Sequence, residues 1–288
     1  MNKIKILVTG SNGQLGRALK LVAELYPGLE FIFLSKEDFP IQHSKIVQHI
    51  FSANKPQFCI NCAAYTAVDK AEIETEEAFL INATATGILA AACDKFNTKF
   101  IHISTDYVFN GNAALPYTEN DQVDPINTYG ASKLKGELLS VACNEQTIII
   151  RTSWVYSQFG NNFVKTMIRL LNEKEILGVV NDQSGSPTYA TDLAQLIIDI
   201  INSSKWEAGI YHYSNDGIIT WFEFASAIKE SIKSTCVINP ITTADFPTLA
   251  KRPLFSGLNK KKIKSHYNCS IPEWKTSLKL CLEKIANQ

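Results

Sequence analysis

Short apolar runs alternate with longer segments of helical periodicity through the first half of the chain. The apolar runs lie at residues 4–10, 31–34, 58–61, 100–104 and 147–153. Apolar residues recur every three or four positions at residues 14–26, 43–53, 76–95 and 130–144. Near-continuous apolar runs are typical of strands buried on both faces, and their alternation with helices is typical of parallel sheets. The pattern therefore predicts an α/β fold built on a doubly wound parallel sheet.

The regularity loosens after residue 155. Helical periodicity returns at residues 161–171, 190–202, 220–233 and 273–286, and strand-like runs stand at 177–180 and 209–214. A proline-containing loop is expected at residues 239–253. We expect a first domain of residues 1–155, rejoined by about 176–217, that binds the cofactor. A smaller, mostly C-terminal substrate-binding domain would then comprise about 156–175 and 218–288.

Composition narrows the classes of partner. The 288 residues carry a formal net charge of +0, which does not favour nucleic acid or an acidic membrane as a partner. No apolar run approaches the roughly 20 residues of a membrane span, and "MNKIKILVTG" lacks a signal-peptide core. Seven scattered cysteines are typical of reduced thiols, so a cytoplasmic location is expected. Cys59 and Cys62 form a C-x-x-C, but "FCINC" predicts a buried strand and does not favour a redox or metal site.

Three glycines follow the first predicted strand directly. Gly10, Gly13 and Gly16 have the spacing G-x-x-G-x-x-G at a strand-to-helix turn. Glycines let the backbone approach a pyrophosphate closely, and the positive end of the helix stabilises its charge. The alternative is a tight turn that only serves close helix packing. Position within a strand–helix–strand unit favours a Rossmann-type dinucleotide site.

The end of the second predicted strand bears on the choice of cofactor. An acidic residue usually stands here to hold the adenosine ribose, but this chain has Ser35 followed by Lys36. A hydroxyl and a cation can accept a 2′-phosphate, which favours NADPH over NADH, although Glu37 and Asp38 follow at once. The alternative is that Lys36 is simply solvated.

Small residues follow the third predicted strand. Ala63 and Ala64 would let a cofactor lie against the carboxyl end of that strand. Asp69, Lys70 and Glu72 are expected to form a solvated helix start.

The candidate chemical centre lies after the fourth predicted strand. "STDYVFNG" (104–111) places polar side chains at the carboxyl edge of the sheet, and Tyr129 and Lys133 follow, four residues apart on one predicted helix face. A free phenol has a pKa near ~10, and a nearby ammonium lowers it. Tyr129 would then protonate a carbonyl oxygen while hydride reaches its carbon, and Thr105 or Ser104 would donate a hydrogen bond to that oxygen. The alternative is a chance Y-x-x-x-K on a helix.

Taken together, the motifs resemble those of a known family. The glycine trio is followed in order by "STDYVF", "YGASK", "RTSWVY", "GNNF", "NDQSGSPT" and "KRPLFSGLN". This succession resembles the dTDP-4-dehydrorhamnose reductases, within the extended short-chain dehydrogenase/reductase superfamily. The resemblance covers nearly the whole chain. It implies NAD(P)H-dependent reduction of the C4 ketone of dTDP-4-dehydro-β-L-rhamnose to dTDP-β-L-rhamnose, the last step in making that sugar donor.

The resemblance also implies roles for individual residues. Tyr129, Lys133 and Thr105 would be catalytic. The residues expected to bind the cofactor are Gly10, Asn12, Gly13, Gln14, Leu15, Gly16, Ser35, Lys36, Ile41, Ala63, Ala64, Tyr65, Ile103, Tyr129 and Lys133. Those expected to bind the dTDP-sugar are Thr105, Asp106, Trp154, Asn162, Phe163 and Arg252. A core aromatic is the alternative for Trp154, and a surface salt bridge is the alternative for Arg252.

Two features depart from the family pattern. Some members bind Mg²⁺ at a dimer interface through glutamates whose matching positions here are Ala18 and Thr191. Neither side chain supplies a carboxylate ligand, so we expect no metal, and a monomer or weak homodimer. The family also often has an acidic residue where Ser35 or Pro40 stands, so the adenosine contacts would differ.

Two other functions stay open. One is a nucleotide-sugar epimerase or 4,6-dehydratase of the same superfamily. Dehydratases pair Asp with Glu after the threonine, whereas this chain has Asp106 and Tyr107. The other is a non-catalytic subunit, because a reductase-like relative regulates methionine adenosyltransferase. The intact set of Thr105, Tyr129 and Lys133 favours catalysis.

Overall fold

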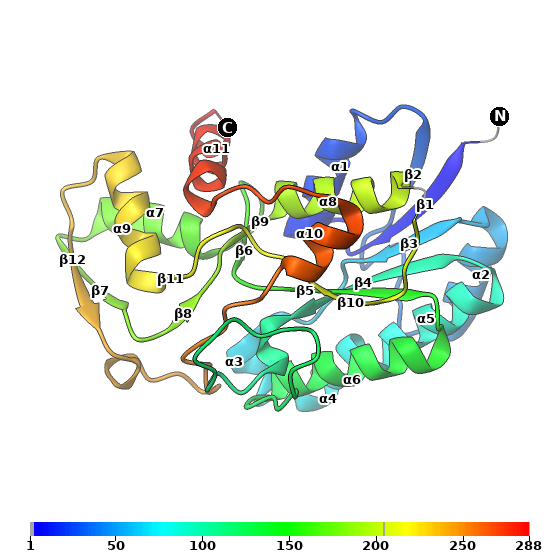
Figure 1. The fold of residues 1–288 in the computed structure, drawn as a ribbon, viewed down its shortest axis with the longest axis horizontal. Helices are drawn as coiled ribbons and strands as arrows, with labels where there is room; N and C mark the ends of the chain where they lie inside the picture. Colours follow the sequence, from blue (N-terminus) through cyan, green and yellow to red (C-terminus); the bar gives the residue numbers. More distant parts are fainter. Residues whose placement is uncertain (1–2, 204, 288) are drawn as a thin grey trace.

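A computed structural model describes residues 3–203 and 205–287 and has a parallel six-stranded sheet at its centre (Figure 1). The strand order is β10-β5-β4-β3-β1-β2. The strands are β1 (Ile4–Thr9), β2 (Leu29–Phe33), β3 (Phe58–Asn61), β4 (Lys99–Thr105), β5 (Thr147–Thr152) and β10 (Gly209–His212). Each strand lies where an apolar run predicted one. The predicted α/β class with a doubly wound parallel sheet is thus confirmed.

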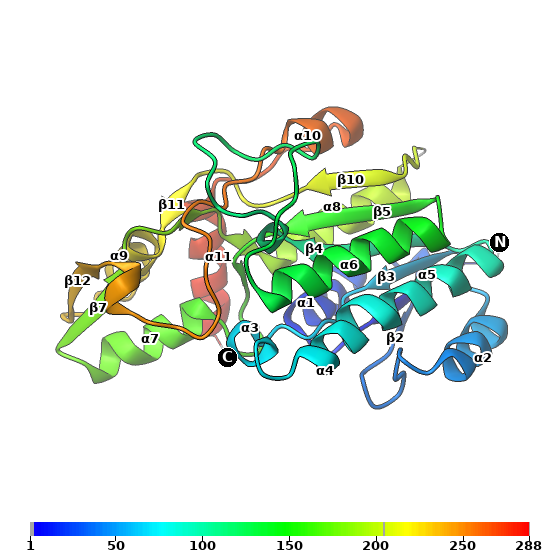
Figure 2. The same cartoon turned by 90° about the horizontal axis from the view of Figure 1, so that it is seen from below.

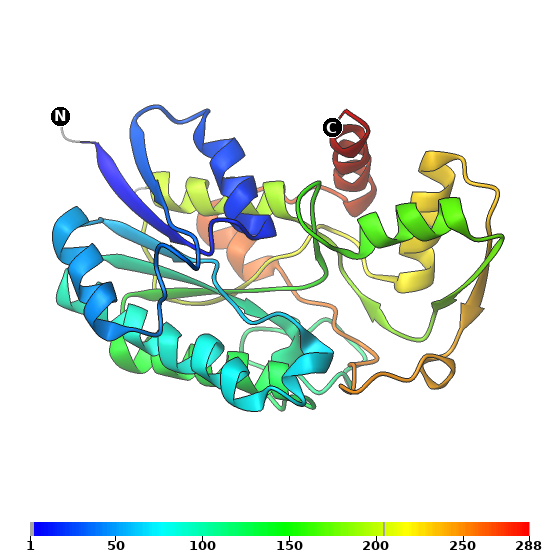
Figure 3. The ribbon, with the colours of Figure 1, turned by 180° about the vertical axis from the view of Figure 1, so that it is seen from behind.

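Helices cover both faces of the sheet (Figures 1 and 3). On one face lie α1 (Gln14–Ala23) and α8 (Ala190–Asn202), which share a core with Val8 and Ile150. On the other lie α2 (Ser44–Asn54) and α5 (Ala85–Lys95), whose core includes Leu7 and Phe100, and beside them α6 (Thr128–Cys143). Successive strand residues thus face opposite cores, which explains runs without polar alternation.

The direction of winding reverses between β1 and β3. The chain passes from β1 to β2 at one edge and then returns to place β3 on the other side of β1. In such sheets ligands bind at the carboxyl ends of the strands beside this reversal. The loops after β1 and β3 are therefore the expected binding loops.

A second unit packs beside the carboxyl edge of the sheet (Figure 2). Its own apolar core includes Tyr156, Phe224 and Trp274. Its helices are α7 (Phe163–Glu173), α9 (Trp221–Ile232) and α11 (Trp274–Ala286). Its short paired strands are β7 (Ile176–Val180) with β12 (Val237–Ile241), β8 (Ser184–Gly185) with β11 (Ile219–Thr220), and β6 (Val155–Tyr156) with β9 (Thr188–Tyr189).

Some elements differ from the sequence prediction. The predicted loop at 239–253 begins inside β12, which pairs in parallel with β7, and contains a short 3-10 turn at Thr243–Asp245. The sequence prediction missed this edge strand because "VINPI" contains Pro240, and proline argues against a strand interior. Helix α10 (Lys261–Tyr267) was missed because "KKIKSHY" buries only Ile263. The remaining short helices are α3 (Val68–Ala71), α4 (Thr75–Phe79), a π turn (Leu80–Thr84) and a 3-10 turn (Asp106–Val108).

Among the described residues, none of the helices combines the length and the apolar character needed to cross a membrane.

Candidate active site

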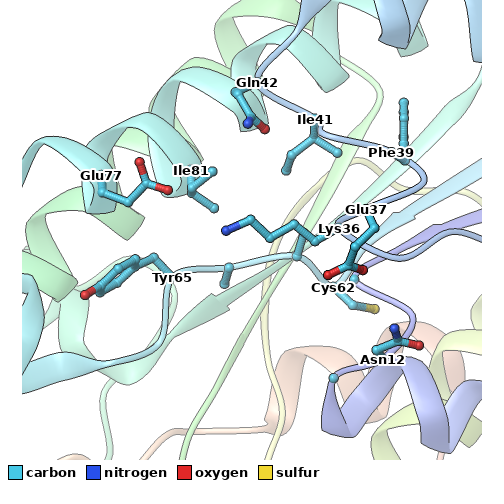
Figure 4. A pocket seen from close by; sticks show the side chains of 14 residues that line it. Asn12, Lys36, Glu37, Phe39, Ile41, Gln42, Cys62, Tyr65, Glu77 and Ile81 are labelled. Carbon is cyan, nitrogen blue, oxygen red and sulfur yellow. The ribbon is translucent and has the colours of Figure 1, made fainter.

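A cavity of about 270 Å³ opens at the reversal point of the sheet (Figure 4). It lies between the loops that follow β1, β2 and β3. Of the residues predicted to bind the cofactor, those that line it are Gly10, Asn12, Gly13, Lys36, Ile41, Ala63, Ala64 and Tyr65. The structure thus brings together residues from three separate stretches of the sequence.

The glycine loop is shaped by close backbone contacts. Gly10 has φ +62°, and a Cβ there would lie 2.6 Å from the backbone nitrogen of Ala63. A Cβ on Gly16 would lie 2.5 Å from the carbonyl oxygen of Gly10. Glycine is required at both positions, at the first by conformation and contact and at the second by contact. The backbone therefore lies bare at the amino end of α1, which suits a pyrophosphate.

Three predicted cofactor residues have side chains engaged elsewhere. The Gln14 Oε1 accepts hydrogen bonds from Ser157 and Asn162, each 2.9 Å long. Leu15 is buried in the core between α1 and the sheet. The Ser35 hydroxyl donates to the Asp38 carboxylate at 2.7 Å, so it would have to exchange this partner to donate to a 2′-phosphate. A contact from Gln14 or Leu15 to a cofactor would have to come from the backbone.

The cavity also includes residues that sequence reasoning did not name. They are Glu37, Phe39, Gln42, Cys62, Glu77 and Ile81. Phe39 and Gln42 lie within two residues of the predicted Ile41, so the reasoning that named Ile41 could have named them too. Glu77 and Ile81 come from α4 and the π turn, and only tertiary packing brings them here.

The amino end of α6 positions Tyr129. Asn127 caps the helix by accepting a hydrogen bond from the Gly130 backbone nitrogen at 2.8 Å. A Cβ on Gly130 would lie 2.1 Å from the Tyr107 carbonyl oxygen, so glycine lets α6 pack directly on the turn after β4. The Tyr129 ring then meets the Tyr107 ring edge-on at 5.8 Å. Thr105, at the end of β4, lies within hydrogen-bonding reach of Tyr129.

The electrostatics of Tyr129 differ from the expectation. Burial raises the pKa of Tyr129 above its ordinary value, hydrogen bonding to Thr105 lowers it less, and Asp106 raises it further. Lys133 is 1% exposed, and its Nζ donates to the Ile103 carbonyl oxygen at 2.6 Å. Burial lowers the pKa of Lys133 to about 8. The sequence predicted a lowered phenol pKa beside this ammonium, but here burial dominates and raises it, and Lys133 is not among the groups that shift it.

Asp106 is a buried carboxyl group beside this pair. It is 2% exposed and accepts a hydrogen bond from Thr105 at 3.0 Å. Burial raises the pKa of Asp106 from 3.8 to about 6. The carboxyl, which contacts the catalytic candidate Thr105, can therefore change its protonation at mildly acidic pH.

The raised pKa of Asp106 predicts a pH dependence of stability. Between pH 3.8 and 6 the folded protein holds a proton that the unfolded chain has released, so the free energy of unfolding falls as pH rises through this window. Relative to Asp106→Asn, the wild-type protein should lose up to about 3 kcal/mol from pH 4 to pH 7. Urea unfolding at several pH values measures this. Asp94→Asn, at an exposed position, should keep the wild-type slope, and equal slopes for both variants would contradict the prediction.

The predicted sugar-binding aromatics lie where the second unit begins. Trp154, with φ +47°, stacks on Trp221 with ring centroids 3.5 Å apart, and Phe163 contacts Trp221 at 4.5 Å. Asn162 caps α7 by accepting from the Lys165 backbone nitrogen, and its amide donates to Gln14. Trp154 and Phe163 are partly exposed and available for a ligand, whereas the Asn162 side chain already serves the fold.

Arg252 joins a strap formed by residues 250–252. Its guanidinium donates to the Asp69 carboxylate at 2.7 Å, and Asp69 also accepts from the Ala250 backbone nitrogen at 3.2 Å. Asn127 donates to the Lys251 carbonyl oxygen at 2.8 Å. Glu72 caps α6 by accepting from the Thr128 backbone nitrogen. The predicted helix start at Asp69, Lys70 and Glu72 is present as α3, and Lys70 is exposed. The prediction missed that Asp69 and Glu72 also hold the strap and the start of α6 by hydrogen bonds.

The Mg²⁺ site of some relatives does not fit this chain. Ala18 is fully buried in the core shared by α1 and α8, and Thr191 carries no charge. Within residues 3–203 and 205–287 there is no group of three or more His, Cys, Asp or Glu side chains arranged to hold a metal ion.

Comparisons with known proteins agree with this architecture. Residues 4–287 match the family described as RmlD substrate binding domain. The dTDP-4-dehydrorhamnose reductase of Aggregatibacter actinomycetemcomitans is 40% identical over 96% of this chain and 97% of its own. The spore coat polysaccharide biosynthesis protein SpsK of Bacillus subtilis is 43% identical over 90% of each chain. The crystal structure of dTDP-4-dehydrorhamnose reductase from Bacillus anthracis in complex with NADP has a TM-score of 0.94 and 39% identity, covering 98% of this chain and 100% of its own.

The parallel sheet, the glycine loop at its reversal point and the Tyr129–Lys133 helix define a nicotinamide-dependent oxidoreductase of the short-chain dehydrogenase/reductase type. Within that class, the chain belongs to the dTDP-4-dehydrorhamnose reductase family.

Proposed function

We propose that this protein reduces dTDP-4-dehydro-β-L-rhamnose to dTDP-β-L-rhamnose with NAD(P)H, the last step in the synthesis of that sugar donor. The observation that carries the proposal is the placement of Thr105, Tyr129 and Lys133 at the carboxyl edge of the sheet, on the same edge as the glycine-loop cavity. Family membership supports the choice of substrate.

The cavity suits a nicotinamide dinucleotide. Gly10 and Gly13 line it with backbone that carries no side chain, which favours a pyrophosphate against them. Lys36 and Ile41 would hold the adenosine end, and Ala63 and Ala64 leave space along β3. The bound dinucleotide would supply the hydride.

The protein's own residues would manage the proton and the ketone. Tyr129 is protonated at neutral pH, as a phenol with a pKa of ~10 or above is, so it can donate that proton to the ketone oxygen as negative charge develops. Thr105 would donate a second hydrogen bond to this oxygen. Lys133 holds the Ile103 carbonyl in place beside the site. Trp154 and Phe163 would exclude water from one side of the sugar.

We also propose the division of labour between the two units. Residues 1–155, with about 190–217, would bind the dinucleotide, and about 156–189 with 218–288 would bind the dTDP-sugar. The segment 176–189, which the sequence pattern assigned to the first unit, packs in the second through Val179 and Tyr189. Arg252 would reach the diphosphate by exchanging its contact with Asp69, since a planar guanidinium suits phosphate oxygens. We expect the protein to act in the cytoplasm on a small molecule, as a monomer or weak homodimer, without nucleic-acid or membrane partners.

The same fold serves dehydratases and epimerases. Elimination of water requires a further acid–base group, and Tyr107, which follows Asp106, is a phenol whose pKa burial raises to about 12. Tyr107 is therefore a poor base, which favours simple reduction. A non-catalytic role is disfavoured by the intact Thr105, Tyr129 and Lys133.

The decisive experiment is the oxidation of NADPH by the purified protein with enzymatically prepared dTDP-4-dehydrorhamnose. We expect stoichiometric loss of absorbance at about 340 nm and a product whose C4 configuration, determined by NMR, is that of dTDP-L-rhamnose. Release of water from dTDP-glucose would show that the protein is a dehydratase. No turnover of either sugar would favour the regulatory role.

Lys36 is expected to set the preference for NADPH. Its ammonium lines the adenosine side of the cavity, where a charge-assisted contact to a 2′-phosphate is worth about 1.5–3 kcal/mol. Lys36→Ala should lower kcat/KM for NADPH about tenfold or more and change that for NADH little. Steady-state kinetics with both cofactors measure the ratio. Lys45→Ala removes the same charge from an exposed position of α2 and should leave the ratio unchanged; a higher wild-type kcat/KM for NADH would contradict the assignment.

A further inference from the structure

His102 lies directly behind Lys133 and has no role in the chemistry described above. It is fully buried on β4, and its Nε2 lies 3.4 Å from the Lys133 Nζ. Its Nδ1 lies 3.2 Å from the amide nitrogen of Asn61 on β3. A buried imidazole with both nitrogens in polar contact has its tautomer fixed by these neighbours.

The orientation of the Asn61 amide follows from a donor that cannot rotate. The Ala63 backbone nitrogen donates to the Asn61 Oδ1 at 3.2 Å, and the Thr9 hydroxyl donates to the same oxygen at 2.7 Å. The Ala63 nitrogen also donates to the Thr9 Oγ1 at 3.2 Å, and the Thr9 hydroxyl could rotate to accept from a flipped amide. The Ala63 N–H cannot rotate, however, so a flipped NH₂ group would face it at 3.2 Å. The amide nitrogen must therefore point away from this N–H, toward His102.

The tautomer of His102 follows in turn. Because the Asn61 amide donates to Nδ1, a neutral ring carries its proton on Nε2, the nitrogen that faces Lys133. Burial and the nearby Lys133 lower the pKa of His102 well below its ordinary value, so the ring is neutral at physiological pH. An N–H bond is thus directed at the lysine nitrogen.

Such a donor distinguishes the two forms of the lysine. A neutral amine can accept the Nε2–H bond with its lone pair while still donating to the Ile103 carbonyl oxygen. An ammonium group has no lone pair, and its N–H bonds would face another donor. We propose that His102, oriented by Asn61, is a positioning residue that favours the neutral form of Lys133 and so keeps it able to exchange a proton at each turnover.

The other titratable groups around Lys133 act in the opposite sense. Glu137, one turn further along α6, and Cys62, after β3, both raise the pKa of Lys133. Glu137 is itself paired with Arg151 on β5. Burial outweighs both and brings the pKa to about 8, where both forms of the amine are populated near neutral pH. The tautomer of His102 and its effect on Lys133 do not depend on the proposed function. Only the exchange of a proton by Lys133 during turnover rests on it.

The tautomer can be tested on the wild-type protein by NMR. Long-range ¹H–¹⁵N correlation spectra of the imidazole rings distinguish the Nε2–H tautomer, the Nδ1–H tautomer and the imidazolium. We expect His102 to be neutral with its proton on Nε2 from pH 6 to pH 9. Its signals are assigned by their loss in His102→Gln or, if that variant does not fold, by contacts to Phe100, on which the ring stacks. An Nδ1–H tautomer or an imidazolium would overturn the proposal.

The effect on Lys133 is tested by the pH profile of kcat. In His102→Gln the amide can turn its oxygen toward Lys133 and stabilise the ammonium, so the apparent pKa near 8 should rise by about one unit. His212→Gln is the matched control, because His212 is also buried but contacts the Tyr117 carbonyl oxygen instead. An unchanged profile in His102→Gln would refute the proposal. Failure of the reductase assay would refute the proposed function and leave the NMR result intact.

Discussion

Replacement of Tyr129 by phenylalanine should lower kcat for ketone reduction by about 10² to 10⁴-fold, the usual contribution of a positioned general acid. The substitution removes only the hydroxyl group, and the ring keeps its edge contact with Tyr107. Binding of NADPH, followed by its fluorescence, should be spared, because the glycine-loop cavity lies on other elements. The loss should therefore fall on kcat and leave cofactor affinity intact.

Tyr26→Phe is the matched control for this experiment. The Tyr26 hydroxyl accepts a hydrogen bond from Gln195, away from the site, so its removal should leave kcat near the wild-type value. Near-normal turnover in Tyr129→Phe would remove this residue from the mechanism. Loss of NADPH binding together with turnover would instead point to a structural effect of the substitution.

The second large effect is expected from Glu137→Ala. Glu137 and Arg151 are both 2% exposed, and they share two hydrogen bonds of 2.9 and 2.7 Å. The Ser104 hydroxyl also donates to this carboxylate, at 2.5 Å. Removing one partner leaves a buried guanidinium uncompensated, which costs about 3–5 kcal/mol. Urea denaturation should show this loss in the free energy of unfolding.

An exposed ion pair elsewhere in the chain provides the comparison. Arg169 and Glu173 form a pair of the same 2.7 Å length on the surface of α7, with side chains 60% and 50% exposed. Glu173→Ala should cost less than about 1 kcal/mol. The double variant Glu137→Met with Arg151→Met should recover much of the stability, since no charge is then left buried. Equal losses at both sites would show that burial does not set the cost.

The central sheet was predictable because each of its strands is marked by a short apolar run in the local sequence. "IKILVT" and "TIIIRT" are apolar on both faces, and the short joins leave few alternatives to parallel winding. The glycine loop and Tyr129–Lys133 were predictable for a similar reason, since each motif places its groups within one turn. Contacts between residues far apart in the sequence were not predictable. The pairing of Asp69 with Arg252 joins residues 183 apart, and no local pattern reports it.

The pKa of Tyr129 shows the same limit. Sequence spacing places an ammonium near the phenol, but the sign of the shift depends on how much protein surrounds the hydroxyl. Burial, with Asp106 and Tyr107 nearby, raises the pKa of Tyr129. The surroundings of Ser35 were missed likewise, because Asp38, three residues on, accepts a hydrogen bond from its hydroxyl. Neither set of contacts can be read from the local sequence alone.

The strap at residues 250–252 has a consequence for the growing chain on the ribosome. It holds the start of α6 through Asn127 and α3 through Asp69. The three hydrogen bonds to these two residues are made by strap residues from the last seventh of the polypeptide. The sheet strands up to β5 can emerge and pair long before this segment is synthesised. Catalytic competence should therefore appear only at the very end of translation, and a nascent chain cut short before residue 250 should be an inert intermediate.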